Sequence, residues 1–135
     1  MCIRDRYIVE PNKKIIEEIK KRNRNIPIIW FPRKSNWKTL EFIRKVPCDG
    51  LSIDLETDEQ TIEYCKEKGI TIQGNLDPVR LLLGGKQLKK EVKKIIKKFN
   101  NQKFIFNLSH GILPNTPIAN VEKTIKYIRE YENSN

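Results

Sequence analysis

The chain has 135 residues, of which 38% are hydrophobic, and its 27 basic and 17 acidic side chains give a formal net charge of +10. This length fits one domain or part of a larger one. No apolar run reaches the roughly 18 residues of a membrane-spanning helix, so we expect no membrane partner. The three cysteines, Cys2, Cys48 and Cys65, lie far apart and outside any metal-ligand spacing, which favours reduced thiols in a cytoplasmic protein.

Four short apolar runs, each bounded by Pro, Gly or Asn, predict buried β-strands. They lie at residues 26–31, 50–55, 70–74 and 103–108. Their nearly continuous apolar character is typical of parallel strands that helices cover on both faces.

Helical periodicity fills the segments before, between and after these strands. The predicted helices lie at residues 11–23, at 37–46, around Ile62 and Cys65, at 86–99 and at 117–128. We expect their N-caps at Ser35 or Asn36, at Thr57 in a capping box that ends at Gln60, at Asp77 and at Thr116.

Much of the excess positive charge lies in one of these helices, "KQLKKEVKKIIKKF" at residues 86–99. Its apolar side chains recur at helical spacing, so the lysines occupy the solvated face of an amphipathic helix. Because no aromatic-plus-basic stacking motif or recognition helix accompanies the charge, we expect no nucleic-acid partner. A basic α/β module that binds nucleic acid remains an alternative.

Alternation of helices and strands predicts an α/β fold with parallel strands and right-handed crossovers. Four strands make either a small open sheet or half of an eight-stranded (β/α) barrel. No Gly-x-Gly-x-x-Gly or Walker-type loop follows a strand, which excludes the common nucleotide-binding versions of this fold.

Ligands of such folds bind at the carboxyl ends of the strands. The polar residues at the four predicted strand ends are Arg33 and Lys34; Asp54 and Glu56; Gln73, Gly74, Asn75 and Asp77; and Asn107, Ser109 and His110. His110 is the only histidine, and at this position it can bind a carboxylate or move protons near neutral pH. Metal ligation is not expected, since no second histidine or suitably placed cysteine exists.

Three other strand-end features have two interpretations each. Asp54 and Glu56 could do acid–base chemistry, or they could orient the neighbouring loops. Arg33 could meet an anionic substrate or be surface charge. Gly74 and Asn75 could form a tight turn before a helix capped by Asp77, or Gly74 could let a ligand approach the backbone closely.

Two motifs, "ITIQGNLDP" and "FIFNLSHGILPNTPIANVEKTIKYI", resemble the closing segments of the uroporphyrinogen decarboxylase family, in the same order and at suitable separation. The segments "IPIIWFPR" and "GLSIDLETD" resemble the two preceding strands of that family. The similarity covers roughly residues 8–132.

The resemblance implies the C-terminal half of an eight-stranded (β/α) barrel, or TIM barrel, in a homodimeric lyase. This family removes the four acetate carboxyls of uroporphyrinogen III to give coproporphyrinogen III in haem biosynthesis, and it uses no metal or organic cofactor. Residues 8–135 would form this half-barrel, and residues 1–7 would be a non-native extension of a truncated chain.

The resemblance also implies site residues. His110 matches the active-site histidine of the family, and we expect Arg33, Gly74 and Asn75 to assist in substrate binding. Ser109 stands where the family has glycine. The family's other substrate-binding residues belong to the first half of the barrel, so we assign no catalytic residue here and expect the chain alone to be inactive. A related cobamide-dependent zinc methyltransferase is a second alternative, although its His-x-Cys ligands have no counterpart here.

Overall fold

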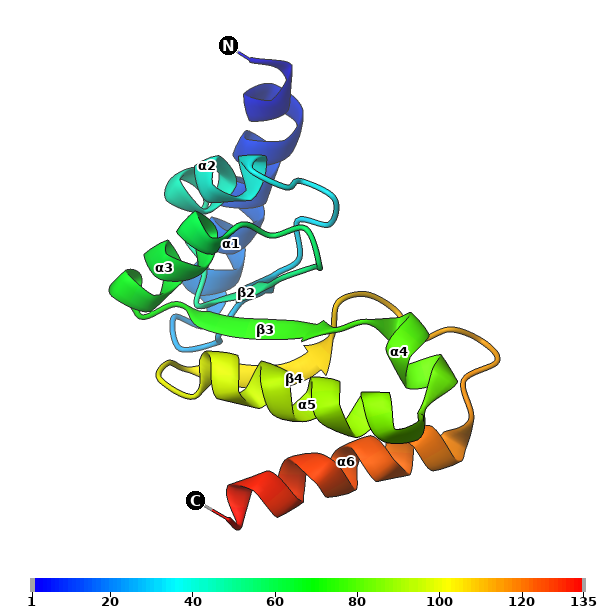
Figure 1. Ribbon diagram of the computed structural model, residues 1–135. Coiled ribbons are helices and arrows are strands. Elements are labelled where there is room, and N and C mark those ends of the chain that lie inside the picture. Colours follow the sequence, from blue (N-terminus) through cyan, green and yellow to red (C-terminus); the bar gives the residue numbers. More distant parts are fainter. Residues whose placement is uncertain (1, 135) are drawn as a thin grey trace.

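The computed structural model describes residues 2–134 and contains a sheet of four parallel strands (Figure 1). The strands follow each other across the sheet in chain order: β1 (Ile29–Trp30), β2 (Gly50–Ser52), β3 (Thr71–Leu76) and β4 (Phe104–Leu108). This arrangement confirms the prediction of an α/β fold with four parallel strands.

Helices precede, connect and follow these strands, as predicted. They are α1 (Glu10–Arg22), α2 (Lys38–Lys45), α3 (Glu59–Lys68), α4 (Pro78–Leu83), α5 (Gly85–Phe99) and α6 (Ile118–Glu132), with a π-helical segment η1 (Asp5–Val9) before α1. The last two helices, α5 and α6, lie side by side (Figure 1). None of the helices described in residues 2–134 is both long and apolar enough to cross a membrane.

Helix α1 begins at Glu10, one residue before the predicted start at Pro11. Pro11 has no backbone N–H to donate to the preceding turn, and the chain before it forms the π-helical segment η1. Val9 is buried, and the Asp5 carboxylate accepts a hydrogen bond from Lys45 Nζ at 2.8 Å. These contacts attach the N-terminal segment to α1 and α2.

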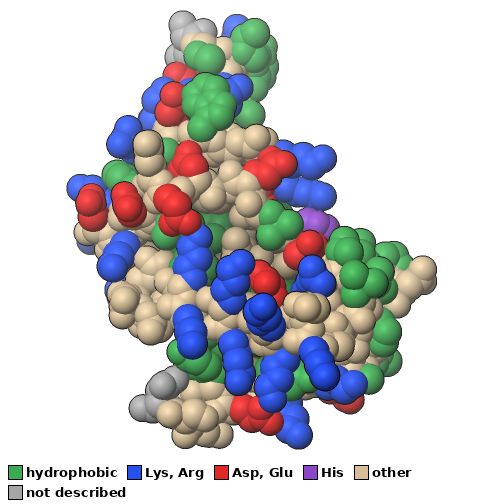
Figure 2. Space-filling view, viewed as in Figure 1, with side chains coloured by type: hydrophobic (Ala, Val, Ile, Leu, Met, Phe, Trp, Pro, Cys, Tyr) green, Lys and Arg blue, Asp and Glu red, His purple; other side chains and the backbone are tan. Residues whose placement is uncertain are grey.

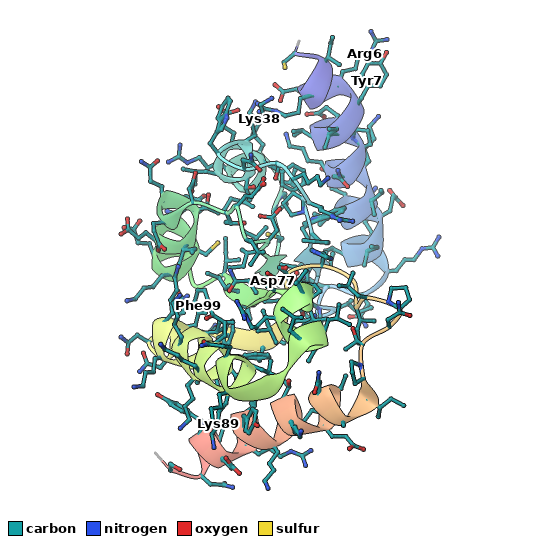
Figure 3. The ribbon with its side chains drawn as sticks, turned by 45° about the vertical axis from the view of Figure 1, so that its right-hand side comes forward. Arg6, Tyr7, Lys38, Asp77, Lys89 and Phe99 are labelled. Atoms are coloured by element: carbon teal, nitrogen blue, oxygen red, sulfur yellow. The ribbon has the colours of Figure 1, made fainter. Side chains whose placement is uncertain are left out.

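Strand β3 runs further than predicted, to Leu76, because its hydrogen bonds to β4 continue to Leu108. Gly74 and Asn75 therefore lie inside a strand and do not form the tight turn that the sequence suggested. The turn follows at Asp77, whose carboxylate accepts a hydrogen bond from the Val79 N–H at 2.9 Å. Asp77 thus caps α4, as predicted (Figure 3).

The other predicted caps are wrong. Asp58, and not Thr57, caps α3, because its carboxylate accepts from the Thr61 N–H at 2.8 Å. The Thr57 hydroxyl is engaged instead with Asp54 at 3.0 Å. The N-cap positions of α2 and α6 are Trp37 and Pro117, and neither helix has a side-chain cap.

Burial along the sheet is one-sided, in contrast to the predicted cover on both faces. Residues of β3 alternate between buried and half-buried, with Ile72 and Leu76 on the buried side. A sheet whose strands follow chain order, with right-handed crossovers, carries all its helices on one face. The opposite face of this sheet therefore has no helical cover in the described chain.

The hydrophobic core lies between the covered face of the sheet and the helices. Helix α5 contributes Leu88, Val92, Ile95 and Phe99, all buried, while its lysines face solvent and form the basic surface in Figure 2. Phe99 stacks on Phe104 of β4 with 4.6 Å between ring centroids, and it points from α5 toward the interior (Figure 3). The predicted amphipathic helix is confirmed.

Candidate functional site

Loops from three strands meet at the carboxyl end of the sheet, where the sequence predicted a site. They enclose a cavity of about 190 Å³, lined by Arg33, Lys34, Asp54, Leu55, Glu56, Ser109 and His110. These residues follow β1, β2 and β4, because the carboxyl ends of parallel strands share one edge of the sheet. The strand ends at Arg33 and His110 therefore come together as predicted.

A second cavity, of about 490 Å³, extends from this edge over the uncovered face of the sheet. Its lining residues are Ile29, Phe31, Ser52, Gln73, Asn107, Leu108, Ser109, His110, Gly111 and Ile112. Ser109 and His110 line both cavities, so they lie on the wall that the two share.

Ser52 and the apolar floor made by Ile29 and Phe31 were not among the predicted site residues. Ser52 lies beside Gln73 in the register of β2 and β3, and Gln73 Nε2 donates a hydrogen bond to Ser52 Oγ at 3.4 Å. The two-residue period of a strand places alternate side chains on one face and could have indicated these residues. The expectation that helices cover both faces of the sheet hid this pattern.

His110 is half-buried, and its Nδ1 lies 3.2 Å from the Gly111 carbonyl oxygen. Because a carbonyl oxygen can only accept, this hydrogen bond requires a proton on Nδ1. In the neutral ring Nε2 is then an acceptor, whereas in the protonated ring both nitrogens are donors. Gly111 does not have the positive φ of a residue that must be glycine. An added Cβ there would meet nothing within 4 Å, so the turn after His110 does not depend on a glycine.

Asp54 orients the loops, the second of its two interpretations. Its carboxylate accepts hydrogen bonds from the Lys34 N–H at 2.9 Å, the Glu56 N–H at 3.1 Å and the Thr57 hydroxyl at 3.0 Å. The bond from Lys34 joins the loop after β1 to the loop after β2, and the other two bonds hold the loop after β2 in shape. Glu56 is exposed at the rim of the smaller cavity.

Arg33 and Lys34 place positive charge beside His110. Neither side chain forms an ion pair within residues 2–134, although both line the smaller cavity with the half-buried imidazole. A guanidinium, an ammonium and a protonated imidazole are groups that bind carboxylates in proteins. This corner of the site can therefore take an anionic group.

Ser109 is completely buried, with 0% of its surface exposed. Its N–H donates to the Leu76 carbonyl oxygen at 2.8 Å, which holds the segment after β4 against the end of β3. Its hydroxyl has no hydrogen-bond partner among the described residues.

Gly74 and Asn75 line neither of these cavities. A Cβ on Gly74 would lie 2.9 Å from the Ile53 carbonyl oxygen, and its φ of +143° favours glycine. Asn75 Nδ2 donates to the Asp54 carbonyl oxygen at 3.5 Å. Both residues thus face the segment that follows β2.

Within residues 2–134, no group of three or more His, Cys, Asp or Glu side chains could hold a metal ion. The chemistry that these residues can supply is the binding of an anion and the donation or acceptance of a proton by His110.

Comparisons with known proteins identify the family of this chain. A family model described as "Uroporphyrinogen decarboxylase (URO-D)" matches residues 5–131. The uroporphyrinogen decarboxylase of Rickettsia bellii is 45% identical over 127 residues, which are 94% of this chain and 37% of that protein. That of Rickettsia africae is 41% identical over 129 residues, again 37% of its length.

The chain thus spans about 37% of the length of the curated relatives it matches. The family model covers most of the chain, and it includes the strands and loops that form both cavities. This chain therefore belongs to the uroporphyrinogen decarboxylase family of carboxy-lyases.

Proposed function

We propose that this chain forms the C-terminal half of an eight-stranded (β/α) barrel in a uroporphyrinogen decarboxylase. A sheet with strands in chain order and helices on one face has the construction of a barrel wall. Its uncovered face would then line the barrel interior, and β1 and β4 would pair with strands of the other half. The match to 37% of the relative's length supports a partial chain.

The proposed reaction of the whole protein is the conversion of uroporphyrinogen III to coproporphyrinogen III in haem biosynthesis. A proton added to a pyrrole α-carbon makes the ring an electron sink, and CO₂ leaves. The remaining methylene carbon then takes up a proton, and the α-carbon releases the proton that it first received. No metal or organic cofactor takes part in this proposal. The protein would act in the cytoplasm as a homodimer.

One observation carries the proposal: His110 and Arg33, from the loops after β4 and β1, line one cavity at the carboxyl end of the strands. Uroporphyrinogen carries several carboxylates, and these cationic or proton-donating groups suit them. His110 would hold a substrate carboxylate or a pyrrole, and Arg33 would assist. The chain alone would be inactive, since the groups that hold the rest of the tetrapyrrole would come from the other half.

Gly74 and Asn75 have a less direct role in this proposal. They would shape the site by holding β3 against the segment after β2, because they face Ile53 and Asp54. Substitution at these positions would then alter substrate binding through the position of the Asp54 loop.

A chimera tests the proposed function. Residues 5–131 of this chain would replace the matching segment of the Rickettsia bellii relative, and porphyrins formed from uroporphyrinogen III would be separated by chromatography. We expect an active chimera in which His110→Ala lowers kcat/KM by about 10–1,000-fold. Lys97→Ala on the exposed face of α5 is the control and should leave the rate unchanged. A folded but inactive chimera would contradict the proposal, and an unimpaired His110→Ala chimera would remove the role of His110.

A further inference from the structure

The hydroxyl of Ser109 is the buried polar group of this site that has no internal partner. The residue is 0% exposed, and its Oγ makes no hydrogen bond within residues 2–134. Its backbone is fixed by the 2.8 Å bond to Leu76, so the side chain cannot move away with the main chain. A buried hydroxyl is normally satisfied by a partner within the protein or by a bound group.

Polar side chains that line the same cavities form hydrogen bonds with groups other than the Ser109 hydroxyl. Gln73 donates to Ser52 at 3.4 Å, and Asn107 Oδ1 accepts from the Leu108 N–H at 2.8 Å. The Asp54 carboxylate accepts the three hydrogen bonds described above. Within residues 2–134 the Ser109 hydroxyl therefore lacks a protein partner, and a molecule that enters the site can supply one.

Both cavities border Ser109. It lines the smaller cavity together with Arg33, Lys34 and His110, and it lines the larger one together with His110. Rotation about the Cα–Cβ bond moves the hydroxyl among staggered positions, so it can turn toward either cavity.

The charges around Ser109 select the ligand. Arg33 and Lys34 are cationic and form no ion pair in the described chain. Two carboxylates line the same cavity: Asp54 accepts three hydrogen bonds, and Glu56 is exposed at the rim. An anion that accepts hydrogen bonds fits the corner formed by Arg33, His110 and Ser109, and a cation would meet two like charges there. Carboxylates form strong hydrogen bonds with hydroxyl and guanidinium donors.

We propose that Ser109, with His110 and Arg33, forms a subsite for one carboxylate, to which the Ser109 hydroxyl donates a hydrogen bond. The proposal rests on the proposed function in taking the carboxylate to be one of those on the tetrapyrrole. The glycine expected at this position from the family resemblance has no hydroxyl and could not donate this hydrogen bond.

The test uses the single histidine of the chain, whose Hε1 gives one NMR signal. Acetate and uroporphyrin III, the oxidised form of the proposed substrate, are titrated separately at low ionic strength. We expect both probes to shift the His110 signal. Ser109→Ala and Ser109→Gly should each weaken acetate binding by about 10-fold, the loss of one hydrogen bond to a charged group.

Thr61→Val is the matched control. Thr61 is also 0% exposed with an unpartnered hydroxyl, but it lies in α3 and lines neither cavity. The control should keep the wild-type affinity for acetate. An NOE from acetate methyl protons to the Ser109 Hβ protons in the wild-type chain is expected as well, and it tests the contact without any substitution.

Each result has a distinct meaning. No acetate-induced shift, no NOE to Ser109, or an equal loss in the Thr61→Val chain would overturn the subsite. Acetate binding that depends on Ser109, without binding of uroporphyrin III, would support a carboxylate subsite and contradict the tetrapyrrole as its source. An active chimera whose KM for uroporphyrinogen is unchanged by Ser109→Gly would overturn the subsite and leave the proposed function standing.

Discussion

The backbone N–H of Lys34 donates a hydrogen bond to the Asp54 carboxylate across 2.9 Å, and this bond joins the loop after β1 to the loop after β2. Lys34 has a left-handed backbone with φ of +59°, a conformation that a non-glycine residue adopts at an energetic disadvantage. The carboxylate thus holds in place the loop that carries Arg33.

We expect Asp54→Ala to loosen this loop and to lower the free energy of unfolding by about 1–3 kcal/mol, because three donors lose their acceptor. Asp54→Asn should have a smaller effect, since one amide oxygen remains to accept. Hydrogen exchange at the Lys34 amide and urea denaturation measure the two effects. Asp77→Ala, which removes a capping carboxylate from α4, should lower stability without faster exchange at Lys34; faster exchange there would contradict the specific role of Asp54.

Gly74 is a position where an added methyl group should be harmful. A Cβ there would lie 2.9 Å from the Ile53 carbonyl oxygen and 3.0 Å from Ile53 Cγ1, at a φ of +143°. We expect Gly74→Ala to destabilise the protein by about 1–3 kcal/mol, measured by denaturant titration. Gly111→Ala, whose Cβ would meet nothing within 4 Å, should change stability by less than about 0.5 kcal/mol. Equal effects of the two substitutions would show that close packing at Gly74 is unimportant.

The positions of the strands along the chain could be predicted from the sequence, because apolar runs ending in Gly, Pro or Asn mark buried parallel strands. His110 and Arg33 could be predicted as neighbours for the same reason, since the carboxyl ends of such strands share one edge. The one-sided burial of β3 follows from strand order and crossover handedness together, and strand order is set by tertiary pairing. An apolar run such as residues 103–108 does not report which face lacks helices.

Caps and single buried groups were harder to predict, because each depends on a local competition for hydrogen bonds. Thr57 and Asp58 are both good N-cap residues, and the outcome was decided by Asp54, which engages the Thr57 hydroxyl. The burial of Ser109 depends on its backbone bond to Leu76 of the neighbouring strand. No local pattern in the sequence reports that bond.

The cysteines should differ sharply in reactivity. Burial raises the pKa of Cys48 to about 11 and that of Cys65 to about 12, with a smaller contribution from the neighbouring Asp49 charge at Cys48. Thiolate is the reactive form, so at about pH 8 we expect one fast-reacting thiol per chain, the exposed Cys2. Reaction with a disulfide reagent should show one fast phase in the native protein and three equivalents in denaturant. A native Cys2→Ser chain that still shows the fast phase would contradict the assignment.

Acid should weaken the junction between α1 and β2. A hydrogen bond from Lys20 Nζ at 2.8 Å, and then one from the Ile28 N–H, hold the pKa of Asp49 below its ordinary value of 3.8. A lowered pKa gives stability that is present above about pH 4 and is lost as the pH falls through the folded value.

Lys20→Met removes the larger of these causes, so unfolding free energies measured between about pH 5 and pH 2 should fall less steeply in this variant than in the wild type. The Asp49 side chain is 48% exposed, so dissolved salt should screen its contact with Lys20. At about 0.5 M salt, where the screening length is roughly 4–5 Å, the difference in slope between the variant and the wild type should be smaller. Lys97→Met removes the same charge from an exposed position of α5, and its slope should match the wild type. If the two substitutions gave the same slope, net charge, rather than the Lys20–Asp49 contact, would govern the acid response.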